Sequence, residues 1–267
     1  MPDNIAVLPA AKQTALSSSA RTGDSPVEPT LLLLGPVDLV GTRGRPPSRA
    51  RKQCIEYCAW LHTHPAARPT EMVADLLVAE TTRRSNMSRL RSWLGESPEG
   101  HQYLPDAYSG VIDLAPEVTS DWERLQSLIS GGVRSASTAS LIEALGMVRG
   151  EPLAQVWFQW GWAAQLRTDM LSLIADVAAV LADRYLSLGD AAGAIWAVQQ
   201  GQLATGPDEI LASRRIEALA LAGEATKLER AVRDLTRQAK AEGRDLSAET
   251  TRRVQRALSS QLRRTGS

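Results

Sequence analysis

The chain has 267 residues, 43% of them apolar, and a formal net charge of zero at pH 7. This length and apolar share predict one or two globular domains with buried cores, and the zero net charge excludes a uniformly polycationic chain. No run of about 18 apolar residues occurs, and the N-terminus lacks the basic start and apolar core of a signal peptide. The sequence therefore predicts a soluble, cytoplasmic protein without a membrane segment.

The charge is unevenly distributed along the chain. The segment Gly41–Gly95 contains ten arginines and lysines and four acidic residues, whereas Glu96–Glu123 contains seven acidic residues. A basic segment inside a neutral chain indicates a local surface for a negatively charged partner.

The first third of the chain shows distinct elements after a beginning without periodicity. Residues 1–29 are rich in Ala, Ser, Pro and Thr and predict a disordered tail or linker. Thr30–Val40 is an apolar run broken by a Gly-Pro pair, which predicts a strand pair or a bent strand. A basic, turn-rich loop follows at Gly41–Arg49. Apolar periodicity then predicts helices over Ala50–His62 and Glu71–Val78.

The stretch Thr81–Gly95 predicts a third helix with two different sides. Met87, Leu90 and Leu94 form one apolar stripe at helical spacing. The opposite side combines two guanidinium groups and three hydroxyls without a carboxylate: Arg84, Ser85, Ser88, Arg89 and Ser92. Such a face suits an extended anion, most often a nucleic acid. The alternative is an ordinary basic surface helix.

A β-hairpin is predicted after this helix. Two short apolar segments, Tyr103–Leu104 and Val111–Leu114, flank the turn-rich sequence Pro105–Gly110. The order of strand, three helices and hairpin is that of a winged helix-turn-helix, in which the third helix enters the major groove and the wing lies along the backbone.

Four stretches of the sequence resemble one family. LLLLGPVDL, NMSRLRSWLG, YLPDAYSGVIDL and DWERLQSLIS are similar to the opening sheet, the recognition helix, the wing and the following helix of SARP-type actinobacterial transcriptional activators. The wing departs from the family's pattern, because Pro105-Asp106-Ala107 stands where a glycine-rich turn usually precedes the tyrosine. The departure concerns the wing's contact with DNA and leaves the predicted fold unchanged.

The second half of the chain is predicted to be helical. Gly131–Thr138, GGVRSAST, predicts a linker. Arg149–Leu153, RGEPL, resembles a tract of the bacterial transcriptional activator domain that adjoins the winged helix in the family. A long helix is predicted from about Ala163 to Leu188. After it, Gly189-Asp190-Ala191 recurs 34 residues later as Gly223-Glu224-Ala225, and 34 residues is the tetratricopeptide (TPR) period.

Two cysteines and a histidine share one face of the first predicted helix. Cys54, Cys58 and His62 stand at i, i+4 and i+8, with His64 nearby, a spacing that could present thiolates and an imidazole to zinc. The same face must form the apolar stripe of the helix, however, and a buried cysteine behaves as a small hydrophobe. Consecutive turns of one helix also give poor geometry for a disulfide. The pattern therefore favours free core thiols in a reducing compartment, with no metal and no cofactor.

The tryptophans and the C-terminal arginines each allow a binding role or a structural role, and the sequence shows no catalytic motif. Trp157, Trp160 and Trp162 could line a ligand groove, but aromatic residues beside a Pro-Leu turn more often pack in a core. The C-terminal arginines could touch nucleic acid, although a solvated helix face is the favoured explanation: Arg252, Arg253, Arg256, Arg263 and Arg264. The histidines show no nucleophile–acid spacing, and no phosphate loop or H-E-x-x-H motif occurs, so the sequence does not predict an enzyme.

Together these patterns predict a mainly α protein. A winged helix-turn-helix domain of three helices with a small β-sheet and wing is followed by an all-α, TPR-like helical domain. The predicted boundaries are a disordered tail or linker at 1–29, the DNA-binding domain at 30–130, a linker at 131–138, the TPR-like activator domain at 139–260 and a disordered tail at 261–267.

The predicted function is sequence-specific DNA binding and transcription regulation. Four side chains of the third helix face the groove, four arginines are placed for phosphates, and the resemblance adds one wing residue: Arg84, Ser85, Ser88 and Arg89; Arg83, Arg91, Arg43 and Arg45; and Tyr108. The resemblance also implies double-stranded DNA as the first domain's partner, and RNA polymerase, a second copy or another protein as partner of the TPR-like domain. The alternative function is a docking scaffold whose winged helix does not bind DNA.

Overall fold

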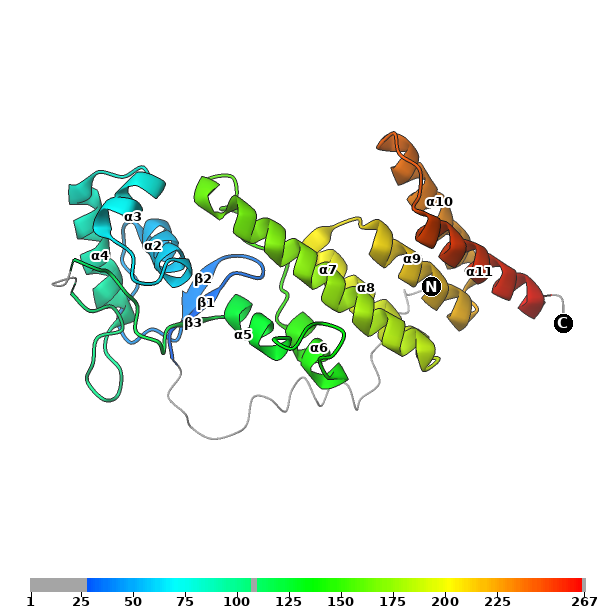
Figure 1. The fold of residues 1–267 in the computed structure, drawn as a ribbon, viewed down its shortest axis with the longest axis horizontal. Coiled ribbons are helices and arrows are strands. Elements are labelled where there is room, and N and C mark those ends of the chain that lie inside the picture. The colour runs from blue at the N-terminus through cyan, green and yellow to red at the C-terminus, as the bar shows by residue number, and fades with distance from the viewer. Residues whose placement is uncertain (1–27, 107–109, 266–267) are drawn as a thin grey trace. The chain divides into compact units, whose positions relative to one another are not determined.

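The computed structural model describes residues 28–106 and 110–265, whose elements Figure 1 shows. This part of the chain contains ten α-helices and one three-stranded sheet. The predicted fold class is confirmed, because a winged helix-turn-helix with a small sheet precedes an all-helical part. The chain divides into two compact units. The first unit comprises residues 26–177 with 203–206, and the second comprises residues 178–202 with 207–267.

The sheet of the first unit begins with the predicted strand pair. The strands β1 (Thr30–Leu32) and β2 (Asp38–Val40) are antiparallel, with Leu31 opposite Leu39, both of them buried. A third strand, β3 (Thr119–Ser120), pairs parallel to β1 and gives the order β2-β1-β3. Strand β3 has no signal in the sequence, because two residues are too short to show the alternation of a strand.

Three helices follow the strand pair, as predicted. They are α2 (Arg51–Thr63), α3 (Pro69–Asp75) and α4 (Glu80–Leu94). In α3, proline occupies the first turn, where its missing N–H costs no hydrogen bond. A capping contact adds to this start, since the Arg68 N–H donates to Glu71 Oε2 at 2.8 Å. Helices α2 and α4 pack against each other, and each buries a row of apolar side chains.

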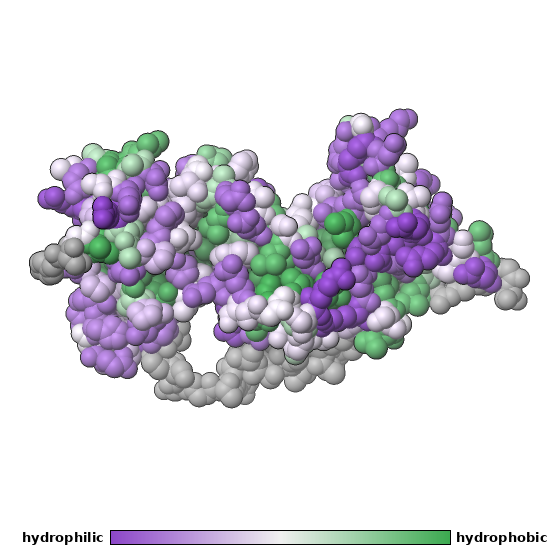
Figure 2. Space-filling model, in the orientation of Figure 1, coloured by the Kyte–Doolittle hydropathy of each residue, from purple (hydrophilic) through white to green (hydrophobic). Residues whose placement is uncertain are grey.

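The turn between α3 and α4 exposes an apolar side chain. Leu77 has a φ of 51°, a left-handed conformation that is unusual for a residue other than glycine. Its side chain is 90% exposed. Figure 2 shows apolar surface over α3 and this turn.

The predicted hairpin after α4 is wrong in its detail. In its described residues the chain forms isolated bridges, Glu96 with Gln102 and Ile112 with Ala67, instead of two paired strands. One bond of the expected kind remains, from the Ala115 N–H to the Tyr103 carbonyl at 2.8 Å. Pro105 disfavours extension of the ladder, because it has no N–H to donate, and its carbonyl accepts from Arg91 instead. The tip of this segment, residues 107–109, lies outside the described residues.

The helices α5 (Asp121–Leu128) and α6 (Thr138–Gly146) lie on either side of the predicted linker. Arg124 of α5 and Glu143 of α6 form an ion pair at 2.5 Å. The first unit therefore continues past the predicted boundary at 131–138. The domain limits given in the sequence analysis stay a prediction, as does the tail at 261–267, into which the last helix extends.

The RGEPL tract after α6 returns to the sheet end of the first unit. The Arg149 N–H donates to the Leu34 carbonyl at 2.8 Å, and the Leu153 N–H donates to the Leu33 carbonyl at 2.9 Å. The Asp121 carboxylate also bonds to the segment after β1 and to Arg149. It accepts from the Leu33 N–H at 2.7 Å and from Arg149 Nη2 at 3.1 Å. These bonds join three segments that lie far apart in the sequence.

The last five helices are α7 (Ala164–Ser187), after the short 3₁₀ turn η1 (Gly161–Ala163), then α8 (Ala191–Thr205), α9 (Glu209–Ala222), α10 (Ala225–Ala241) and α11 (Ala248–Thr265). The backbone supports the predicted 34-residue repeat. Gly189 and Gly223 have φ values of 73° and 75°. After them, the Asp190 N–H donates to the Tyr185 carbonyl at 2.9 Å, and the Glu224 N–H donates to the Leu219 carbonyl at 3.0 Å. Both turns are therefore the same glycine-containing helix ending.

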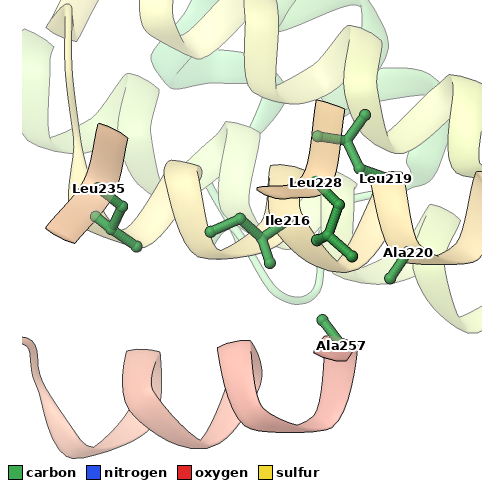
Figure 3. Close-up of a cluster of buried hydrophobic side chains, with 6 residues drawn as sticks. All are labelled: Ile216, Leu219, Ala220, Leu228, Leu235 and Ala257. Atoms are coloured by element: carbon green, nitrogen blue, oxygen red, sulfur yellow. The ribbon is translucent and has the colours of Figure 1, made fainter. Parts of the chain in front are cut away.

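The core of the second unit lies between α9, α10 and α11 (Figure 3). Its buried members come from all three helices: Ile216, Leu219, Ala220, Leu228, Leu235 and Ala257. In α10, Leu228 and Leu235 lie seven residues apart on one face, and the exposed positions between them are mostly charged. This pattern is that of an amphipathic helix covering its neighbours.

Candidate nucleic-acid interface

The two predicted sides of α4 are present in the structure. Met87, Leu90 and Leu94 are buried. All members of the opposite side are exposed: Arg84, Ser85, Ser88, Arg89 and Ser92. A row of guanidinium and hydroxyl groups therefore stands clear of the core along the length of the helix.

The basic loop before α2 lies against the end of α4. The Arg43 N–H donates to the Leu94 carbonyl, and the Gly44 N–H donates to the Trp93 carbonyl, each at 3.0 Å. A Cβ atom at Gly44 would lie 1.8 Å from the Ser92 carbonyl oxygen, so the approach requires glycine. The side chains of Arg43 and Arg45 are exposed beside the predicted groove-facing side. The structure thus brings these two predicted phosphate-binding residues to the same end of α4.

One carboxylate lies at the start of the predicted face. Glu80 Oε1 accepts from Arg84 Nε at 2.7 Å and from Arg83 Nη2 at 2.7 Å, and Glu80 Oε2 accepts from Arg83 Nε at 2.8 Å. Hydrogen bonds from Arg83 and then Arg84 lower the pKa of Glu80 to about 2. The prediction of a face without carboxylates is therefore wrong, because α4 begins at Glu80, one residue before the predicted helix Thr81–Gly95.

Arg83 does not lie on the exposed side. Its side chain is buried beside the apolar stripe, and its guanidinium is bonded to Glu80 through two nitrogens. Helical spacing accounts for this position, since Arg83, Met87, Leu90 and Leu94 follow one another at i, i+4, i+7 and i+11. Arg83 is therefore part of the buried side of α4, in the first turn of the helix.

Arg89 has a neutral partner instead of an acidic one. Its Nη1 donates to Asn86 Oδ1 at 2.6 Å. Asn86 is 1% exposed, and its Nδ2 donates to Gln53 Oε1 of α2 at 3.1 Å. Sequence reasoning missed Asn86, although a polar residue at i−4 from Leu90 on the apolar stripe is a visible signal.

Arg91 joins α4 to the segment that follows it. Its Nε donates to the Leu104 carbonyl at 2.7 Å, and its Nη2 lies 3.3 Å from the Pro105 carbonyl and 2.8 Å from Asp106 Oδ1. Arg91 therefore holds the base of the wing. Tyr108, the predicted wing contact, lies outside the described residues.

The cysteines and histidines of α2 belong to the core and its edge. Cys54 and Cys58 are free and buried, as the sequence pattern predicts. Burial raises the pKa of the Cys54 thiol to about 11 and also raises the pKa of Cys58. His62 Nε2 lies 3.4 Å from Glu123, and His64 stacks on Trp60 with ring centroids 4.4 Å apart. Among the described residues, no cluster of three metal-ligating side chains occurs.

The remaining candidates divide between packing and surface. Trp160 is buried and stacks on Trp162 with centroids 5.6 Å apart, whereas Trp157 is half exposed beneath the guanidinium of Arg167. The C-terminal arginines also divide. Arg253 is largely buried, and its Nη1 lies 3.1 Å from Asp183 and 2.5 Å from Glu217. Arg252, Arg256 and Arg263 are exposed.

A comparison with solved structures gives a match in fold. The chain is similar to a solved structure of EmbR from Mycobacterium tuberculosis in complex with a low-affinity phosphopeptide, with a TM-score of 0.62 and 19% sequence identity. The similarity covers 91% of this chain and 70% of the EmbR chain. The two share the winged-helix and helical architecture. No protein-family model and no curated protein matches the chain. No helix in the described residues is both long and apolar enough to cross a bilayer.

Proposed function

We propose that the chain is a SARP-type transcription regulator that binds double-stranded DNA with α4 in the major groove. The observation that carries the proposal is the exposed Arg/Ser face of α4, which no other described element covers. An arginine can read a guanine edge through two parallel N–H groups, and serine hydroxyls can bond to bases or phosphates. The family motifs in the sequence and the fold shared with EmbR, a SARP-family regulator, support the same conclusion.

The structure refines the roles proposed for single residues. Arg84, Ser85, Ser88 and Arg89 remain the proposed base-reading side chains, and Arg43 and Arg45 remain the proposed phosphate contacts. The sequence also predicts phosphate contacts for Arg83 and Arg91, but their protein partners favour structural roles, Arg83 in the first turn of α4 and Arg91 between α4 and the wing. Tyr108 is kept as a proposed wing contact.

The test is duplex binding by fluorescence anisotropy at several salt concentrations. The wild-type chain should bind a random duplex with an affinity that falls as salt rises, with a slope of about −0.9 per neutralised phosphate. The double variant Arg84→Ala/Arg89→Ala should bind more weakly. The matched control is Arg230→Ala/Arg233→Ala, which removes two exposed arginines from α10 and should leave binding unchanged. Absence of salt-dependent binding by the wild-type chain would favour the docking scaffold instead.

For the TPR-like part we propose a role in activation or partner contact in the cytoplasm. RNA polymerase, a second copy of the chain or another protein are the proposed partners, and they rest on the family resemblance. Light scattering after gel filtration tests whether two copies of the chain associate. Co-purification tests whether RNA polymerase binds.

A further inference from the structure

A buried amide occupies a position of α4 that apolar residues otherwise fill. Asn86 lies on the packed side with Leu90 and Trp93, and it is 1% exposed. A buried amide lowers stability unless its polar atoms are hydrogen-bonded. Both ends of this amide are bonded, Nδ2 to Gln53 Oε1 at 3.1 Å and Oδ1 to Arg89 Nη1 at 2.6 Å. The side chain thus connects α2 to an exposed arginine of the proposed DNA-binding face.

The connection has a direction. An asparagine amide has one accepting oxygen and one donating nitrogen, and which side faces which neighbour is set by the partners. Arg89 can only donate, so the Asn86 oxygen faces the guanidinium, and the Asn86 nitrogen donates to Gln53 Oε1 of α2. In the flipped orientation, the amide nitrogen would face another donor. Arg89 therefore fixes which way the amide faces, and the bond to Gln53 holds the other end of the amide to α2.

The two exposed arginines of the face are held by chemically different partners. Arg84 is paired with the charged carboxylate of Glu80, which also repels phosphates. Arg89 is paired with a neutral amide, which leaves its full charge available and fixes one of its terminal nitrogens. Holding a long side chain in one geometry before binding reduces the entropy lost on binding. Arg89 is therefore the better prepared of the two for a bidentate contact to guanine.

We propose that Asn86 is a positioning residue that aims Arg89 at a guanine edge, so that one base preference of α4 depends on a buried amide. This inference rests on the proposed DNA-binding function. Asn86 itself lies too deep to touch DNA, and it acts through Arg89.

The experiment is a binding selection on randomised duplex with the full chain, run for the wild type, Arg89→Ala, Asn86→Leu and Asn86→Asp. Arg89→Ala identifies the base position that Arg89 reads. Asn86→Leu removes the acceptor and should lower guanine preference at that position about tenfold, which corresponds to about 1.4 kcal/mol. Preference at the other positions and the salt slope should stay unchanged. Asn86→Asp keeps an acceptor oxygen in the same place, so it should keep the preference while its added negative charge weakens binding of all sequences.

Thermal unfolding of each variant separates positioning from a general loss of structure. If Asn86→Leu does not fold, Gln53→Ala supplies the same test, because Gln53 is exposed and its removal takes away the bond that holds the Asn86 amide to α2. It should weaken the same base position. A folded Asn86→Leu or Gln53→Ala variant with the wild-type preference overturns the inference, and so does an equal loss at every position. If the wild-type chain itself selects no sequence, the proposed function fails instead.

Discussion

Replacing Glu80 by glutamine should strengthen the binding of any duplex. The carboxylate lies at the first turn of α4 and restrains Arg84 through a 2.7 Å bond. In the wild type, DNA must compete with this carboxylate for Arg84 and approach its negative charge. Glutamine retains an oxygen that can accept from the buried Arg83, but it removes the charge. The change therefore frees Arg84 while keeping a partner for Arg83.

The size of the effect follows from the exposure of the pair. Two unit charges 2.7 Å apart attract each other by about 1.5 kcal/mol in water. The side chains of Arg84 and Glu80 are 74% and 42% exposed, and such pairs contribute only about 0–1 kcal/mol after solvent screening and side-chain entropy. Affinity for duplex should therefore rise about two- to fivefold, within that range. If the freed Arg84 reaches a phosphate, the salt slope should steepen by about 0.9.

The assay is anisotropy with a random duplex at several salt concentrations, with Glu99→Gln as the control for loss of one exposed carboxylate. Acidification cannot imitate the substitution near neutral pH, because the pKa of Glu80 is lowered to about 2. Its folded-state pKa lies below the ordinary value of 4.5, so its contribution to folding stability is present above that value and is lost as the pH falls towards 2. An unchanged or weaker affinity in a folded Glu80→Gln variant would refute this reasoning.

Two further predictions concern the first unit. Replacing Cys54 and Cys58 together by alanine should lower the free energy of unfolding by about 1–3 kcal/mol through lost packing, measured by urea titration. Duplex binding at low temperature should persist, and stoichiometric zinc that disappears with this substitution would contradict the core role. Asp121→Ala should lower the free energy of unfolding by about 3–5 kcal/mol, because it leaves the N–H groups of Leu33 and Leu34 and the Nη2 of Arg149 without the acceptor they share. Limited proteolysis between residues 131 and 137 should then separate fragments more readily than in the wild type, and equal rates would argue against this role.

Most elements of the fold are predictable, because they have a local signal in the sequence. Apolar spacing marks α4, the Gly-Pro break marks the turn between β1 and β2, and the glycine repeat marks the turns after α7 and α9. The hairpin was not predictable in detail. Its residues bond to Arg91 and to the loop between α2 and α3, and such partners cannot be read from the local sequence.

In the candidate site too, some features follow from the local sequence and others depend on tertiary contacts. The exposed side of α4 follows from helical spacing alone, whereas the partners of its arginines do not. Glu80 lies one residue before the predicted helix Thr81–Gly95, and the buried position of Arg83 follows from the same spacing that places Leu90. The bond between Asn86 and Gln53 joins two helices, so only the tertiary structure reveals it.

The bonding of β1 has a consequence for synthesis on the ribosome. This strand leaves the ribosome about 90 residues before its parallel partner β3 and about 120 residues before Arg149 and Leu153, which bond to the end of the same segment. At about 5–20 residues per second, the strand waits on the order of 5–25 s with one edge unpaired. An unpaired strand edge can recruit another chain, and a very short edge strand limits that risk. The three-residue length of β1 therefore suits a strand whose neighbours arrive late.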